Sequence, residues 1–77
     1  MKEFVEFIAK YLVDNPDGVS VEVKNPDEKK TVLTLKVSPE DVGKVIGKQG
    51  KTAQSMRTLL TAIAAKEGKR AILEILD

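Results

Sequence analysis

Few residue types in this chain could carry out chemistry, and the distinctive ones gather around one short motif. The 77-residue sequence has no histidine and no cysteine, so it lacks the commonest general base, the thiolate nucleophile and the commonest metal ligands. What stands out is Gly47-Lys48-Gln49-Gly50, with Lys44 before it and Lys51 after it. Two glycines around a basic and an amide side chain are typical of a loop that binds an anion through its main chain. We therefore expect a binding protein with no catalytic activity and no cofactor.

Charge is distributed unevenly along the chain. The formal net charge is +1, yet between Asp41 and Glu67 the sequence has five basic residues and no acidic one. The five are Lys44, Lys48, Lys51, Arg57 and Lys66. The rest of the chain holds eight basic and twelve acidic residues, a balance of −4. Segregation of this kind predicts a basic face that meets an anion such as nucleic acid.

Three interpretations of the two glycines compete. In the first, Gly47 ends one helix and Gly50 lets the next helix approach closely. In the second, Gly50-Lys51-Thr52 is the end of a nucleotide-binding loop, but that motif requires a preceding strand and a glycine where this chain has Val45. In the third, a turn without Cβ atoms at either end lets a sugar-phosphate backbone lie against the main chain at the start of a helix. The third uses both glycines and the lysines, and we favour it.

Periodicity predicts the elements that must position this loop. Apolar residues at helical spacing predict a helix over residues 2–14, which Asn15-Pro16-Asp17-Gly18 ends. Alternation predicts strands over 19–24 and 33–37, joined by a polar loop from 25 to 30 into an antiparallel hairpin, and a last strand over 71–75. Ser38, as a cap, and Pro39 predict the start of a short helix that Gly47 ends. A longer helix over 51–66 follows and ends before Gly68.

The order helix-strand-strand-helix-helix-strand predicts an α+β fold of two layers, with a three-stranded mixed sheet, in a single domain over 1–77. We expect its core to contain Phe4, Phe7, Ile8 and Tyr11, the strand residues Leu33, Leu35 and Val37, and Ala53, Met56, Leu60, Ile63 and Ala64 of the long helix. No aromatic side chain is then left exposed. The N-terminus does not resemble a signal peptide and no apolar run approaches a membrane span, so we expect a cytoplasmic protein.

The stretch DVGKVIGKQGKTAQSMRTL strongly resembles the core of the K-homology (KH) domain, V-I-G-x-x-G. The element order resembles the type II arrangement, and the whole chain is similar to the small bacterial single-KH proteins of the KhpA/YlqC family. Ala53 departs from the pattern, since many KH domains have a larger aliphatic residue there. The resemblance implies a non-catalytic protein that clamps about four nucleotides of single-stranded RNA, as an RNA chaperone or post-transcriptional regulator. Binding to single-stranded DNA stays open.

The resemblance also assigns roles to individual residues. It implies RNA binding by Gly47, Lys48, Gln49 and Gly50 and by the flanking Lys44, Val45, Ile46, Lys51 and Arg57. KH grooves hold bases on an aliphatic floor, and we expect Val45 and Ile46 to form it here together with Val32 or Thr34. Core packing is the alternative role for Ile46.

The long helix has more apolar surface than one buried side requires. Leu59, Ala62 and Ala65 lie outside its predicted inner face, and a helix that is apolar on two sides is usually buried on both. Leu59 and Ala62 are thus candidates for a dimer interface, although Leu59 could instead pack against the first helix. The resemblance implies self-pairing, association with a larger KH protein of the Jag/KhpB type, or both. A dimerisation adaptor is therefore the alternative function.

Overall fold

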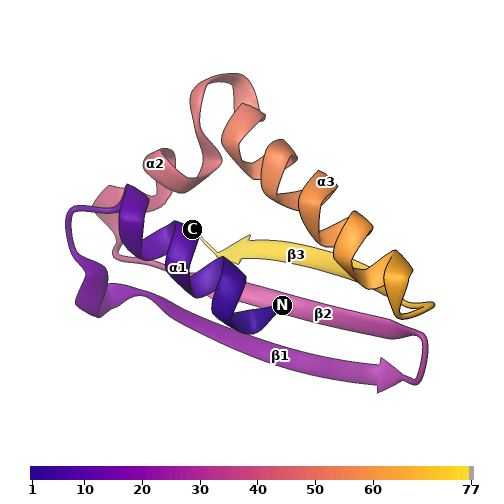
Figure 1. The fold of residues 1–77 in the computed structure, drawn as a ribbon. Coiled ribbons are helices and arrows are strands. Elements are labelled where there is room, and N and C mark those ends of the chain that lie inside the picture. Colours follow the sequence, from indigo (N-terminus) through magenta and orange to yellow (C-terminus); the bar gives the residue numbers. More distant parts are fainter. Residues whose placement is uncertain (77) are drawn as a thin grey trace.

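All three α-helices of the described chain lie on one face of a three-stranded sheet (Figure 1). The computed structural model describes residues 1–76. In chain order the elements are α1 (Lys2–Leu12), β1 (Ser20–Asp27), β2 (Lys30–Lys36), α2 (Val42–Ile46), α3 (Lys51–Lys66) and β3 (Arg70–Leu76). Single 3-10 turns precede β1, α2 and α3, over Pro16–Gly18, Pro39–Asp41 and Lys48–Gly50.

The central strand β2 pairs antiparallel with β1 and parallel with β3. This mixed sheet, with α2 and α3 forming the crossover between its parallel strands, confirms the predicted fold class, a type II KH domain. The hairpin between β1 and β2 is longer than predicted, because Asn25, Pro26 and Asp27 belong to β1 and only Glu28 and Lys29 turn. Pro26 is tolerated there because β1 is an edge strand, and the pairing register is irregular between Lys24 and Asp27.

The core lies between the sheet and the helices, as the alternation of the strands predicts. Leu33, Leu35 and Val37 are buried on the helix side of the sheet, with Leu73 of β3 beside them. The predicted inner face of α3 is confirmed: Ala53, Met56, Leu60 and Ala64 are buried, and Ile63 is half-buried. None of the helices in residues 1–76 combines the length and the apolar character needed to cross a membrane.

The predicted inner face of α1 is right in part. Phe4 and Ile8 are half-buried and pack against the core, but Phe7 is 69% exposed and Tyr11 is 82% exposed. The fully buried residues of the helix are Val5 and Ala9, which were not predicted. The helix carries two apolar stripes at helical spacing, and periodicity alone does not choose between them. The stripe with the smaller residues faces the sheet, which allows α1 to lie close to it. The expectation that no aromatic side chain is exposed is therefore wrong.

The start of α2 also differs from the prediction. Ser38 makes no side-chain cap, and its Oγ instead accepts a hydrogen bond of 2.8 Å from Asn15 Nδ2. Pro39 does open the helical segment, but as a 3-10 turn. The acidic residue at the end of that turn, Asp41, is fully buried. α2 itself has only five residues and ends at Gly47, as predicted.

Candidate nucleic-acid interface

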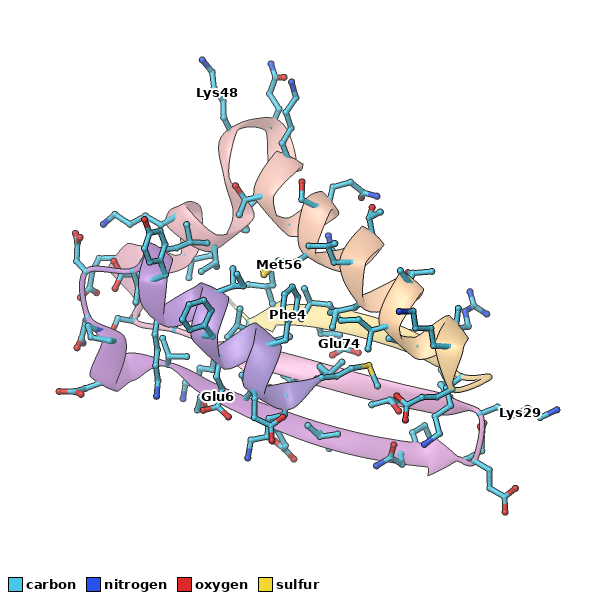
Figure 2. All side chains as sticks on the ribbon, in the orientation of Figure 1. Phe4, Glu6, Lys29, Lys48, Met56 and Glu74 are labelled. Atoms are coloured by element: carbon cyan, nitrogen blue, oxygen red, sulfur yellow. The ribbon has the colours of Figure 1, made fainter. Side chains whose placement is uncertain are left out.

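The Gly47–Gly50 turn lies at the tip of the α2–α3 pair, remote from the sheet, and Figure 2 shows Lys48 pointing away from the rest of the molecule. Three of its four residues have positive φ: Gly47 at 79°, Gln49 at 58° and Gly50 at 74°. The Gly50 N–H donates to the Gly47 carbonyl at 3.1 Å, which closes the turn. Lys48 and Gln49 are both exposed. The chain therefore reverses within four residues and presents its main chain to solvent.

The two glycines are needed for different reasons. Gly47 has φ 79° and ψ 172°, a conformation almost confined to glycine, and an added Cβ would lie 2.6 Å from Thr52 Cβ and 2.9 Å from Thr52 N. Gly50 has a left-handed conformation, but an added Cβ would meet nothing within 4 Å. Gly50 is thus not required for close packing of α3, and the space beside it is open to a ligand.

No side chain of residues 1–76 neutralises the positive end of the helix dipole at the start of α3. No side chain caps it and its first turn contains no acidic residue. The partial positive charge of the helix dipole is therefore available to an anion. Lys48 and Lys51 add full charges, are exposed, and form no ion pair with any residue of the described range 1–76. The turn and the first turn of α3, here called the loop cluster, together favour a phosphate group.

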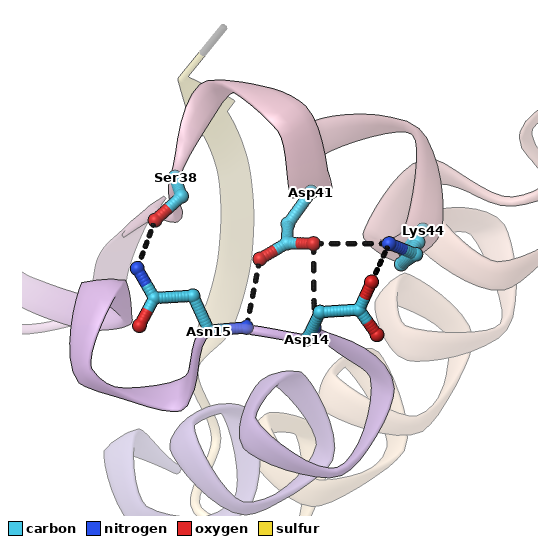
Figure 3. A network of polar contacts seen from close by, with 5 residues as sticks. All are labelled: Asp14, Asn15, Ser38, Asp41 and Lys44. Carbon is cyan, nitrogen blue, oxygen red and sulfur yellow. Dashed lines mark hydrogen bonds and ion pairs between the residues drawn. The ribbon is translucent and has the colours of Figure 1, made fainter.

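Lys44 is not part of the loop cluster. Its Nζ lies 2.6 Å from Asp14 Oδ2 and 3.1 Å from Asp41 Oδ1 (Figure 3). The hydrogen bond to Asp14, followed by that to Asp41, raises the pKa of Lys44, so the ammonium stays charged. Both carboxylates come from outside the acid-free stretch, so counting charges along the sequence could not reveal the pairing. The basic stretch consequently presents less free charge than its composition indicates.

The predicted aliphatic floor is corrected by the sheet geometry. Val45 is fully buried and belongs to the core, which leaves the half-buried Ile46 as the accessible aliphatic side chain of α2. Val32 and Thr34 alternate with the buried residues of β2, so they face the opposite side of the sheet. There they line a shallow hollow with Lys24, Asn25, Pro26 and Glu74. Ile46 cannot share a floor with them.

Arg57 lies apart from the loop cluster, at the edge of the sheet. Its Nη2 donates to the Leu73 carbonyl of β3 at 3.4 Å. A second shallow hollow between α3 and β3 contains both Arg57 and Arg70 and is completed by Thr61, Ala71, Ile72 and Leu73. Arg70 was not among the predicted site residues, because it follows Arg57 by 13 positions and only the parallel return of β3 brings them together. The structure thus has a second basic position farther along α3.

Comparison with known proteins places the whole chain in one family. The family model "KhpA/KhpB, KH domain" matches residues 2–75. The chain is 56% identical over 77 residues to RNA-binding protein KhpA of Clostridium perfringens, covering 99% of this chain and 100% of that one. It is 54% identical to RNA-binding protein KhpA of Aquifex aeolicus, covering 100% and 96% respectively, and 46% identical to that of Listeria monocytogenes, covering both fully. The protein with this glycine-bracketed turn on a type II KH fold therefore belongs to the KhpA/KhpB family of KH domains.

Proposed function

We propose that this protein binds single-stranded RNA without catalysis, clamping about four nucleotides at the Gly47–Gly50 turn. The observation that carries the proposal is the exposed turn at the uncapped start of the 16-residue helix α3, with Lys48 and Lys51 beside it. A phosphate there meets main-chain N–H groups, the positive end of a helix dipole and two ammonium groups. The curated relatives named RNA-binding protein KhpA support RNA as the ligand.

In this proposal the bases of the RNA lie beside Ile46, and the RNA backbone continues along α3 toward β3. Arg57 lies six residues beyond Lys51, about 9 Å farther along the helix axis. With Arg70 it provides two guanidinium groups in the hollow at the sheet edge, where a second phosphate is favoured. The backbone-directed contacts predict modest affinity and low sequence specificity, which suits an RNA chaperone or post-transcriptional regulator in the bacterial cytoplasm.

The dependence of RNA affinity on salt tests this assignment of phosphate contacts. If two to four phosphates are neutralised, log affinity falls against log salt with a slope of about −1.4 to −2.8. Lys51→Ala and Arg57→Ala should each make the slope shallower by about 0.7, because each removes one contact. Affinity of a short single-stranded RNA is measured by fluorescence anisotropy over a salt series.

Lys24→Ala is the matched control for the salt series, because Lys24 is exposed on β1, the edge strand that β2 separates from β3. Its slope should equal that of the wild type. A flat salt response of the wild type, or an equal effect of Lys24→Ala, would contradict binding through the loop cluster. The same series with a DNA oligonucleotide of equal sequence decides between RNA and single-stranded DNA.

Dimerisation through α3 is a second proposed function, and the exposed apolar surface of this helix supports it. Leu59 is 51% exposed, Ala62 is exposed beside it, and Ala65 is exposed about one turn beyond Ala62. Leu59 therefore gains little from packing inside the monomer. From Thr58 to Ala65 the helix carries no charge, so the surface around Leu59 suits a second α3 from another copy or from a larger KH protein. Two turns in one dimer would raise the avidity for a long RNA.

Leu59→Glu should convert a dimer into a folded monomer. The new carboxylate would have to lose its water in the interface, whereas in the monomer it remains solvated. Mass is measured by light scattering at tens of micromolar, with Ser20→Glu as a control that adds the same charge to an exposed position of β1. A wild type that is already monomeric at that concentration would rule out the homodimer and leave the larger KH partner to be tested by the same variant.

A further inference from the structure

A buried carboxylate ties the link between α1 and β1 to the start of α2. The Asp41 side chain is fully buried, and its two oxygens accept hydrogen bonds from two consecutive main-chain N–H groups. Oδ1 accepts from Asp14 N–H at 3.3 Å and Oδ2 accepts from Asn15 N–H at 3.1 Å. These are the residues at which the chain leaves α1, as Figure 3 shows. Asp41 thus holds together segments 26 and 27 positions apart.

Lys44 completes this arrangement from within α2. Its Nζ bonds to Asp41 Oδ1 and to Asp14 Oδ2, so one ammonium bridges the buried carboxylate and the exposed one. Beside it, Asn15 Nδ2 donates to Ser38 Oγ at 2.8 Å. The link after α1 is therefore held at two points, by Asp41 and by Ser38. We refer to Asp14, Asn15, Asp41 and Lys44 as the clamp.

The clamp satisfies a charge that would otherwise be costly to bury. Burial by itself raises the pKa of Asp41, but the hydrogen bonds from Asn15 N–H, Lys44 and Asp14 N–H outweigh it, and the pKa lies below its ordinary value. No buried side-chain polar atom in residues 1–76 lacks a partner. A buried carboxylate that loses one of its partners is strongly destabilised, so the members of the clamp depend on one another.

The clamp lies at one end of α2 and the loop cluster begins at the other. α2 spans Val42–Ile46, too short to be stable as a helix by itself. Its last hydrogen bond, from Gly47 N–H to the Gly43 carbonyl at 2.9 Å, fixes the residue at which the turn starts. What holds the first turn of α2 in place thereby also determines the position of Gly47.

We propose that Asp41 and Lys44 are positioning residues: the clamp fixes α2 against the α1–β1 link and so holds the Gly47–Gly50 turn ready for a phosphate. In this assignment Lys44 acts inside the protein and is not a phosphate ligand. Two carboxylates surround its single ammonium, so the site as a whole carries negative charge and disfavours an approaching phosphate. Lys48 has no such partners in the described chain. The proposal rests on RNA binding at the turn.

The test compares Lys44→Met with Lys48→Met, which remove the same charge and keep similar side-chain length. For a short oligouridine, Lys44→Met should weaken binding at least threefold at one salt concentration and leave the salt slope at its wild-type value. Lys48→Met should make that slope shallower by about 0.7. Lys44→Arg should restore affinity, because a guanidinium can bridge both carboxylates. Asp41→Asn probes the clamp directly. If the Asp41→Asn protein does not fold, the comparison of Lys44→Met with Lys48→Met still tests the proposal.

Amide hydrogen exchange without RNA separates this proposal from RNA binding itself. Lys44→Met should speed exchange at least threefold at Asp14, Asn15 and Gly47, while the Gly68 amide, bonded to the Ala65 carbonyl at the other end of α3, stays unchanged. Wild-type exchange at Gly47 in this variant, or a salt slope shallower by about 0.7, overturns the proposal. Failure of the wild type to bind RNA would instead refute the proposed function, and the exchange data would still decide the role of the clamp.

Discussion

A variant with Lys48→Asp and Gln49→Asp should bind single-stranded RNA at least tenfold more weakly than the wild type. The double change places two carboxylates where the proposed phosphate lies, at the exposed tip of the turn. The new carboxylates repel the phosphate, and their negative charge offsets the attraction from the positive end of the α3 helix dipole. Stability should change by only about 0.5 kcal/mol, because both side chains are exposed and aspartate tolerates the left-handed conformation of Gln49. Affinity is measured by fluorescence anisotropy and stability by urea unfolding.

The matched control carries Ser20→Asp and Lys24→Asp, which change the net charge by the same amount on β1, the edge strand that β2 separates from β3. Both positions are exposed. If RNA binding depends only on the overall charge, the two double variants will lose equal affinity, and the turn has no special role. Undiminished binding by a folded Lys48→Asp, Gln49→Asp protein would refute RNA binding at the Gly47–Gly50 turn outright.

Gly47→Ala should cost far more stability than the same change at Gly50. At Gly47 the new methyl group meets Thr52 at both side-chain and main-chain atoms, and the backbone occupies a region that only glycine adopts readily. We expect a loss of about 2–3 kcal/mol in the free energy of unfolding. RNA affinity should fall at least tenfold, because α3 can then no longer keep its position behind the turn.

Gly50→Ala is the internal control for that experiment. The left-handed conformation of Gly50 costs alanine about 1 kcal/mol, and no atom lies close enough to add a clash. Urea unfolding of the two variants under the same conditions gives the comparison. Equal losses at Gly47 and Gly50 would mean that the contact with Thr52 does not restrict the turn.

The sequence predicted the elements well wherever a single local signal decided them. The boundaries of α3 follow from Gly50 and Gly68, and its buried residues recur at helical spacing. The mixed sheet could be predicted because the last strand rejoins the sheet only after a connection of two helices. By contrast, the buried side of α1 was predicted only in part, since two apolar stripes satisfy the same period. Phe4 and Ile8 pack against the core, but which residues are fully buried, Val5 and Ala9, depends on how α1 packs in the assembled fold.

The site shows the same division between local and long-range information. The turn could be predicted, because its two glycines and its lysines are consecutive in the chain. The pairing of Lys44 with Asp14 could not, since 30 positions separate them and no local pattern relates them. The placement of Val32 and Thr34 failed for another reason: alternation, which correctly puts Leu33 and Leu35 on the covered face, puts Val32 and Thr34 on the open face, away from Ile46. Arg70 joins Arg57 only through the parallel pairing of β3.

A nuclear magnetic resonance titration of the ¹⁵N-labelled protein with a short single-stranded RNA can locate the bound RNA residue by residue. Binding at the turn predicts that the largest shifts of amide signals fall on residues 46–53, followed by Arg57 and the neighbouring residues of β3. Amides of β1 at Glu22 and Lys24, on the edge of the sheet opposite β3, should not move. Shifts confined to the open face of the sheet around Val32 and Thr34, with the signals of residues 46–53 unchanged, would contradict the assignment of the Gly47–Gly50 turn as the RNA-binding site.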